Sequence, residues 1–525
     1  MNVLEIGTFI AINKNKKTMK KIFLSLLCLG LVVISCNKKD DAPIIDEEEI
    51  VIPEEEVPVV VDIEVQNFFW QTLNLYYFWQ GDVPDLADDR FDTQAGYEEF
   101  LTANPEPVAF LENKLLFSED RFTFYSDDYT DLVNSSAGVS KSNGLQFGLS
   151  LIGNTDDVFG YVEYIIKGSD ASTKDIKRGE VFTGVNGTNL NRTNYIDLLF
   201  GDNDTYTLNM AEIVNNTISP INKEVTLTKQ EGLQEDPIYV TDVITSGDKK
   251  IGYFMYNQFV SGSEDAMNAV FADFKSQGVT DLVLDLRYNL GGRGSTATIL
   301  ASLIKGTTIT DLLFRTIYNA KLQAEFDSSS TDNYFVSTTG TFDGNSNAAL
   351  NTLNLSQVYI IATSSSASAS ELVMVGLEPY INVVHIGSTT VGKNQGSVLF
   401  VDDPEGGNVY DETRVNNINP NVQWGLQPII SRVENSAGFS DYADGLIPDI
   451  ALDEDITNLG VLGDSNEPLL ARAIQEITGV GAKRSFDVMI PARVISSSKL
   501  HDPRNATLLL NNSVPTSKFS LTQKK

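Results

Sequence analysis

Cysteine and histidine are almost absent from this sequence, whose 525 residues contain two of each. Both cysteines, Cys28 and Cys36, lie near its start. The rest of the sequence therefore has no thiol for an internal disulfide, a cysteine nucleophile or a thiolate-ligated metal. This excludes cysteine proteases and zinc sites built on cysteine, and we expect neither a metal nor another cofactor.

The two histidines stand in poor surroundings for a catalytic base. His385 lies within an apolar run, residues 383–386, that predicts a buried strand, where a single histidine is more often a core residue than a catalyst. His501 lies in a polar stretch with proline, arginine and asparagine neighbours. A hydrolase with this sequence therefore needs another base, and lysine is the known substitute.

Positive charge is also scarce. The sequence has 38 lysines and arginines against 71 acidic residues, which gives a net charge of −33. Such a surface cannot neutralise phosphates, so nucleic acid is excluded as a partner. Hydrophobic residues make up 42% of the sequence. This fraction is typical of a globular protein, and the length predicts about two to four domains.

A basic start and a short apolar run mark the N-terminal end. Met19 is followed by two lysines, and residues 22–34 form a run of signal-peptide length that is too short to span a membrane. We predict a signal peptide over 1–35, with Met19 as the true start. The run is followed by Ser35 and Cys36 in a context that resembles a bacterial lipobox, which implies that Cys36 is lipidated. An ordinary cleaved signal that contains a cysteine is the alternative.

Residues 36–60 are acidic and contain proline, which predicts an extended, solvated tether. Within it, Lys39, Asp40 and Asp41 resemble the surface-export signal of Bacteroidetes lipoproteins. These features predict a protein of the bacterial cell envelope that is lipid-anchored to the outer membrane. Whether it is exposed at the cell surface stays open.

Aromatic and apolar residues recur at helical spacing after the tether, which predicts a small helical N-terminal domain over 61–130. The members of this stripe are Val65, Phe68, Phe69, Leu73, Tyr76 and Tyr77. An aromatic stripe of this kind is far more often core than ligand site, so no chemistry is assigned to it.

Short β-like runs broken by glycine, asparagine and aspartate follow at 136–232. Their order, a glycine loop with a strand, a Lys-Arg-Gly turn and a Val-Asn-Gly segment, resembles a PDZ domain. The resemblance implies that an extended peptide adds to a sheet edge while loop N–H groups hold its carboxylate. The implied peptide-binding residues are Gly144, Leu145, Gln146, Phe147 and Gly148. A small β domain without a binding function is the alternative.

Residues 238–480 alternate between strand-like and helix-like patterns, which predicts an α/β domain. Four apolar runs predict strands, and they cover residues 250–259, 281–287, 358–362 and 383–386. Ser261 and Glu264 have the spacing of a capping box, which predicts that a helix begins there. Residues 481–525 are predicted to form a polar tail. The chain is therefore predicted to be a multidomain α/β protein.

A serine-rich segment, residues 363–371, follows the predicted strand 358–362 and precedes an apolar helical run. A nucleophile on such a strand-to-helix turn is exposed at the sheet edge. The N-terminus of the helix offers N–H groups and a positive dipole to an oxyanion. A Ser/Ala-rich loop with an N-cap is the alternative for this segment taken alone.

Two further segments favour a catalytic site. Gly291 and Gly292 follow the buried strand 281–287, and paired glycines let the backbone approach a reacting carbonyl. Lys393 follows the strand after the serine-rich segment, so the chain returns to the same sheet edge with a lysine. Lysine titrates at about 10.4 in water, so it acts as a base only if desolvation or a positive neighbour lowers its pKa.

These segments read D-L-R-Y-N-L-G-G at 285–292, S-A-S-A-S-E at 366–371 and G-K at 392–393. They resemble the motifs of the carboxy-terminal processing proteases, or tail-specific proteases, over residues 140–475. The resemblance implies a crotonase/Clp-like α/β protease domain. It also implies that Ser368 is the nucleophile and Lys393 the base. The implied oxyanion hole uses the N–H of Ala369 and that of Gly291 or Gly292.

The sequence departs from this family after Lys393. The glutamine that orients the lysine in some members, four positions on, is replaced by Ser397, and Gln395 is the candidate to serve instead. An acidic residue found in some relatives eleven positions after the serine falls on Pro379, with Glu378 adjacent. The identity of a third catalytic member therefore stays open.

The resemblance implies a serine endopeptidase that cleaves unfolded or C-terminally exposed polypeptides through an acyl-enzyme on a Ser-Lys dyad. Its partners would be protein or peptide substrates with apolar C-termini and, through the lipid, a membrane. A peptide-binding surface lipoprotein that keeps the fold without turnover is the alternative. The altered residues after Lys393 keep that alternative open.

Overall fold

The structure is a computed structural model that describes residues 62–341, 344–479, 486–501 and 508–510. The predicted signal peptide, Cys36 and the acidic tether lie outside these described residues. No helix within the described ranges is long and apolar enough to span a membrane.

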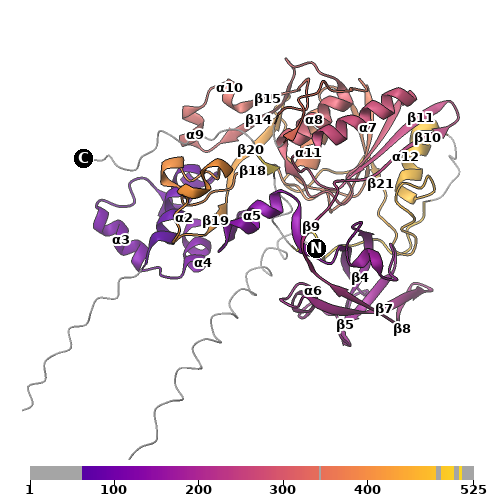
Figure 1. Cartoon of the computed structure of the whole chain (residues 1–525), viewed down its shortest axis with the longest axis horizontal. Helices are drawn as coiled ribbons and strands as arrows, with labels where there is room; N and C mark the ends of the chain where they lie inside the picture. Colours follow the sequence, from indigo (N-terminus) through magenta and orange to yellow (C-terminus); the bar gives the residue numbers. More distant parts are fainter. Residues whose placement is uncertain (1–61, 342–343, 480–485, 502–507, 511–525) are drawn as a thin grey trace, which may run out of the picture. The chain divides into compact units, whose positions relative to one another are not determined.

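The central sheet of the α/β domain contains the four predicted strands. Its strands, in spatial order, are β10 (Ile238–Ser246), β11 (Lys249–Tyr256), β12 (Asp281–Asp285), β16 (Gln357–Ala362), β17 (Asn382–Gly387) and β21 (Ile450–Ala451). The strands β10, β11 and β21 are labelled in Figure 1. From β11 to β21 all neighbours are parallel, and β10 pairs antiparallel with β11. The carboxyl ends of β12, β16 and β17 therefore meet at one sheet edge.

Side chains alternate between the two faces of this sheet, and each face has its own core. On one face, Phe254, Leu284 and Ile360 pack with helices α7 (Glu264–Gln277), α8 (Gly294–Lys305) and α11 (Ala369–Leu377). On the other, their strand neighbours Tyr253, Val283 and Ile361 pack with α12 (Pro468–Thr478). Burial on both faces explains why these strands read as unbroken apolar runs.

The predicted capping box at the start of α7 is wrong, although the helix is present. Ser263 stands at the N-cap, and its hydroxyl donates to the Val260 carbonyl instead of capping the helix. The Glu264 carboxylate is used elsewhere, because it accepts bonds from Thr296 and Asn345. Tertiary partners therefore replaced the local cap that the spacing suggested.

A second sheet lies beside the loops that follow these strands. Its strands, in spatial order, are β13 (Gly292–Arg293), β23 (Leu508–Leu509), β18 (Gln395–Ser397), β20 (Ile429–Asn435), β14 (Leu312–Tyr318) and β15 (Asp332–Tyr334). The strand β23 is parallel to both of its neighbours. Leu508 is fully buried. The predicted polar tail thus contains residues that pack as a strand.

The helical N-terminal region is present but does not have a core of its own. Its elements are α2 (Glu64–Tyr76), η3 (Gln80–Asp82), η4 (Pro84–Leu86), α3 (Gln94–Thr102), α4 (Pro107–Phe110) and η5 (Leu111–Leu115). The aromatic stripe of α2 packs with Phe400, Leu426 and Ile430 from far along the chain. After it, β1 (Phe124–Ser126) pairs with β19 (Gly425–Gln427), and α5 (Tyr129–Ser136) follows.

Residues 139–234 form a β-rich region, as predicted. Its main sheet has the order β22 (Ser496–Ser497), β3 (Leu145–Leu151), β4 (Val158–Ile165), β5 (Val181–Val185), β7 (Thr205–Val214) and β8 (Thr217–Thr228). The short β6 (Thr188–Asn189) pairs with β5, and α6 (Tyr195–Leu199) precedes β7. β2 (Val139–Ser142) and β9 (Gln230–Gln234) pair where the chain enters and leaves the region.

Candidate active site

The loops that follow β12, β16 and β17 are joined by backbone hydrogen bonds. The Ala367 N–H donates to the Asn289 carbonyl at 3.1 Å, and the Val391 N–H donates to the Ser366 carbonyl at 3.0 Å. The predicted glycine pair, serine and lysine therefore stand on three loops that are held together at one sheet edge.

Ser368 occupies the N-cap position of α11 in a strained conformation. Its φ is 61° and its ψ is −111°, a combination that side-chain-bearing residues rarely adopt. Its Oγ is buried and has no hydrogen-bond partner among the described residues. The turn thus holds a hydroxyl at the positive end of a helix and leaves that hydroxyl uncommitted.

Glu371 joins the segments of the serine and the lysine. Its Oε2 accepts the backbone N–H of Ser368 at 2.7 Å and that of Lys393 at 2.9 Å. Its Oε1 accepts the N–H of Gly392 and the hydroxyl of Thr390. Burial raises the pKa of Glu371 above its ordinary value, against the effect of these four donors. The motif alone marked this glutamate without revealing its role.

Lys393 is fully buried. Desolvation lowers its pKa to about 7, assisted by the positive charge of Arg121 and opposed by Asp120 and Glu371. Its Nζ lies 4.7 Å from the ring centroid of Phe122. An amine in these surroundings is partly neutral at physiological pH, as a general base requires.

The N-terminal region supplies part of this environment through Arg121, a residue outside the aromatic stripe to which no chemistry was assigned. The Arg121 guanidinium donates to the carbonyl oxygens of Gly392 at 3.4 Å and of Ala443 at 3.1 Å. Arg121 and Gly392 are 271 positions apart in the chain. No periodicity or local spacing could have indicated this contact.

Gly291 lies directly against the serine. A Cβ placed on Gly291 would stand 2.7 Å from Ser368 Cβ and 3.0 Å from the Ala369 nitrogen, so only glycine fits. Its φ of 110° also favours glycine. Its N–H donates to the Asn289 Oδ1 at 2.8 Å. Gly291 thus gives close approach, while its N–H is already engaged in this structure.

The N–H of Gly292 points elsewhere. The Gly291 carbonyl accepts from the Phe259 N–H, and the Arg293 N–H donates to the Phe259 carbonyl. Backbone groups alternate along a strand, so the N–H of Gly292 faces the opposite side, where β23 lies. The two predicted N–H donors therefore differ: the N–H of Gly291 is bonded to Asn289, whereas the N–H of Gly292 faces β23.

The candidates for a third catalytic member fall in different places. Gln395 begins β18, and its Oε1 is buried without a partner among the described residues, as is the Oγ of Ser397. Glu378 is the C-cap of α11, about 15 Å along the helix from Ser368 at 1.5 Å per residue. Glu378 therefore cannot contact the serine, and a role for Gln395 stays a prediction.

His385 lies in β17, as predicted. It is buried, and its Nε2 is 3.1 Å from the Ala362 carbonyl oxygen. Burial lowers its pKa below the ordinary value. Among the described residues, no group of histidine, cysteine and carboxylate side chains could hold a metal ion.

The predicted peptide-binding loop of the β-rich region is satisfied by its own neighbours. The Gly144 N–H donates to the Ser142 Oγ and the Leu145 N–H to the Asn143 Oδ1, each at 3.0 Å. The edge of β3 that a peptide would use is paired with β22, where Gly148 stands opposite Ser497. In this structure the predicted carboxylate site is therefore closed, and its function stays a prediction.

A buried cluster of charges lies behind the glycine loop. Arg287 is fully buried and donates to Asp285, Glu454 and Glu467. Arg178, from the β-rich region, donates to Glu454 and to the Tyr288 hydroxyl. The cluster thereby connects the β-rich region to the strand β12 and its loop.

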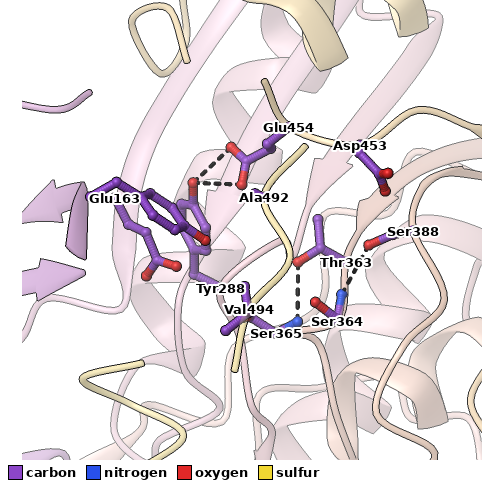
Figure 2. A pocket seen from close by; sticks show the side chains of 11 residues that line it. Glu163, Tyr288, Thr363, Ser364, Ser365, Ser388, Asp453, Glu454, Ala492 and Val494 are labelled. Atoms are coloured by element: carbon purple, nitrogen blue, oxygen red, sulfur yellow. Dashed lines mark hydrogen bonds between the residues drawn. The ribbon is translucent and has the colours of Figure 1, made fainter. Parts of the chain in front are cut away.

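Figure 2 shows a small pocket next to this cluster. Glu163, Tyr288 and Glu454 line one side, and Thr363 and Ser364, from the loop that leads to Ser368, line another. Burial, assisted by Glu454, raises the pKa of Glu163 to about 8. This carboxyl group is therefore largely protonated at neutral pH.

Comparison with known proteins agrees with these features. Residues 250–435 match the family described as peptidase family S41, and residues 64–124 match the peptidase S41 N-terminal domain. A probable CtpA-like serine protease of Staphylococcus aureus is 25% identical over 279 residues, which cover 51% of this chain and 48% of the relative. One of Staphylococcus epidermidis is 26% identical over 220 residues, covering 39% and 40%. The chain thus spans about half the length of these relatives or less.

A solved structure shares the fold. The crystal structure of a putative S41 protease from Bacteroides fragilis has a TM-score of 0.56 and 24% sequence identity. The superposition covers 78% of this chain and 97% of that one. Residues 64–124 and 250–435 are thus similar to peptidase family S41, the family of the carboxy-terminal processing proteases that the sequence motifs resemble, and the chain shares its fold with a solved S41 protease.

Proposed function

We propose that this protein is a serine endopeptidase in which Ser368 is the nucleophile and Lys393 the general base. One observation carries the proposal: a single carboxylate oxygen of Glu371 accepts the backbone N–H groups of both residues. The lysine so positioned is buried, with a pKa lowered to about 7 by desolvation. The similarity to this family supports peptide or protein substrates.

In the proposed reaction the neutral Lys393 amine takes the Ser368 proton as Oγ attacks the carbonyl carbon of a peptide bond. The ammonium then protonates the departing amine, and an acyl-enzyme remains. Water, activated by the same lysine, hydrolyses the ester. The negative oxygen of each tetrahedral state is stabilised by the Ala369 N–H at the N-terminus of α11 and by the Gly292 N–H.

The proposed substrate class is an unfolded or C-terminally exposed polypeptide, because one extended segment, β23, already pairs with both β13 and β18 beside the proposed dyad. The test is cleavage of an unstructured protein by the wild type, Ser368→Ala and Lys393→Arg. Both variants should be inactive, because arginine keeps the charge but cannot deprotonate near neutrality. If Lys393→Arg cleaved the protein at the wild-type rate, Lys393 could not be the general base and the proposed dyad would be wrong.

A serine-directed phosphonate separates this proposal from the non-catalytic alternative. Wild type should form a covalent adduct that Ser368→Ala does not form. An unlabelled wild type would favour a peptide-binding protein without turnover, the reading that the altered residues after Lys393 keep open.

We also propose that Cys36 carries a lipid that anchors the protein to the outer membrane. The support is the apolar run 22–34 that ends before this cysteine. Stable attachment requires more than one acyl chain, as a bacterial lipoprotein cysteine provides. Cys36→Ala should move the protein to the soluble fraction. A variant that sediments with membranes as the wild type does would contradict the anchor.

A further inference from the structure

The chain's own residues 495–501 lie along the edge of β3, where the PDZ-like reading expects a peptide. Ser496 and Ser497 stand opposite Leu149 and Gly148 in antiparallel register. The Ser498 N–H donates to the Phe147 carbonyl at 2.9 Å. A peptide strand could not pair with this edge while the segment is in place.

Side chains strengthen this contact. The Ser498 Oγ accepts from the Phe147 N–H at 3.0 Å and donates to the Gln146 Oε1. The His501 ring stacks on Phe200 with centroids 3.8 Å apart. Three of the five residues predicted to bind peptide, Gln146, Phe147 and Gly148, thus contact the chain's own segment.

A second segment of the chain, residues 508–510, lies in the candidate active site. Leu508 stands opposite Gly292 on one side and opposite Gly396 on the other. The Leu510 N–H donates to the Ser397 carbonyl at 3.1 Å. The segment therefore fills the strip between the glycine loop and the strand that follows Lys393.

The direction of this strand decides which part of a substrate it would stand in for. β13 and β18 begin just after Gly291 and Lys393 and lead away from them, and β23 runs parallel to both. Its carboxyl-terminal side therefore points away from Ser368. Residues 508–510 occupy the positions that would follow the cleaved bond, and the Gly292 N–H faces the same strip.

The absence of a side chain at Gly396 leaves room for Leu510, because a Cβ on Gly396 would lie 2.9 Å from Leu510 Cδ1. Leu508 lies beside Gly294, where a Cβ would be in ordinary contact with its Cδ1 at 3.5 Å. Leu508 belongs to the core shared by α8 and α11. A charged side chain in its place would be desolvated without a partner.

We propose that residues 495–501 and 508–510 act as an internal competitor that occupies both peptide-binding places of the protein. We further assign to the strip between β13 and β18 a preference for leucine-sized apolar residues after the cleaved bond. The role of the strip in substrate binding rests on the proposed function; its occupation by the chain itself does not.

Binding is tested without chemistry in full-length Ser368→Ala protein. The probe is a fluorescent pentapeptide, Thr-Leu-Leu-Leu-Asn, with the sequence of residues 507–511. Adding Leu508→Asp and Leu510→Asp should tighten probe binding at least about tenfold, since a competitor present in nine molecules of ten weakens apparent affinity by that factor. Met489→Asp, at a residue 58% exposed, adds a similar charge outside the strip and should change nothing.

Equal probe affinity with and without the aspartates, or no binding to either protein, overturns the proposal. Because the aspartates could impair folding, Leu508→Ala with Leu510→Ala provides a second variant that keeps the strip apolar. Thermal unfolding of each variant identifies any that is not folded. A second probe, with aspartate in place of the three leucines, should bind to none of these proteins. Equal binding of the two probes would contradict the proposed apolar preference.

The edge of β3 is tested separately with Ser498→Pro, which removes the N–H that bonds Phe147. A labelled peptide of residues 495–500 should then bind at least about tenfold tighter than to the parent. Unchanged affinity would overturn this half of the proposal.

Activity is measured in protein that keeps Ser368. There the substitutions of Leu508 and Leu510 should raise kcat/KM on an unstructured protein. If the substitutions tightened probe binding but neither the wild type nor any variant cleaved protein, the internal competitor would be supported and the proposed peptidase function would be wrong.

Discussion

Ser368 and Lys393 share one acceptor: the Oε2 of Glu371 lies 2.7 Å from the backbone nitrogen of the first and 2.9 Å from that of the second. The positions of the proposed nucleophile and base are thereby set through their backbones, before any contact between their side chains. Glu371 is buried, and its second oxygen holds Gly392 and Thr390. It is a positioning residue for both partners.

Glu371→Gln should lower kcat by about a hundredfold or more, because an amide replaces one acceptor oxygen with a donor that faces backbone N–H groups. A displacement of about 1 Å at a catalytic centre is enough for such a loss. The measurement is kcat and KM on an unstructured protein, beside circular dichroism to establish folding. Glu378→Gln, at the other end of α11, is the matched control and should behave as the wild type. A fully active Glu371→Gln would contradict the positioning role.

Arg121→Gln should move the activity profile toward alkaline pH. Arg121 is one of the groups that lower the pKa of Lys393 to about 7, so removing its charge raises that pKa. In the proposed mechanism, activity depends on the neutral amine of Lys393. A rise of one unit would lower the neutral fraction at pH 7 from about one half to about one tenth.

The rising limb of kcat/KM against pH measures this shift. Arg90→Gln, in the same N-terminal region but exposed, is the control. A limb that stays in place, or moves toward acid pH, would show that Arg121 does not act on the lysine.

Gly291→Ala should abolish activity, because the added methyl group would lie 2.7 Å from Ser368 Cβ at a backbone φ of 110°. We expect a loss of at least about a hundredfold by the same geometric reasoning. Gly81→Ala is the control, since a Cβ there meets no atom within 4 Å. Phosphonate labelling of Ser368 reports the damage independently of substrate binding. Normal labelling of Gly291→Ala would mean that the loop of Gly291 can move to accept the methyl group, which would contradict the prediction.

Arg287→Met should destabilise the fold by about 3–5 kcal/mol, because it leaves Asp285, Glu454 and Glu467 buried without their shared partner. Urea denaturation at pH 7 measures the free energy of unfolding. Arg432→Met, at an exposed position of β20, should change it by less than about 1 kcal/mol. A similarly small effect for Arg287→Met would mean that water or protonation relieves the buried carboxylates.

The sequence was informative where local pattern decides structure. Unbroken apolar runs identified β11, β12, β16 and β17, because strands covered on both faces need no polar alternation. The motifs located Ser368, Lys393 and Gly291 correctly at one sheet edge. What spacing could not reveal were contacts over long chain separations, such as those of Arg121 with Gly392. The strand β23 escaped notice because three leucines within a polar stretch are too few for a periodic signal.

The contacts of Arg178 with Glu454 and Tyr288 connect the β-rich region to the α/β domain through charge. With Arg178 in place, two guanidinium groups face the carboxylates of Asp285, Glu454 and Glu467. Although burial raises the pKa of Glu454, the two arginines hold it below the ordinary value. If the β-rich region swung away and took Arg178 with it, one cation would remain among three carboxylates, and Glu454 would bind a proton more readily. Any separation of Arg178 from Glu454 would therefore be coupled to proton uptake by this cluster, and acidification would favour that separation.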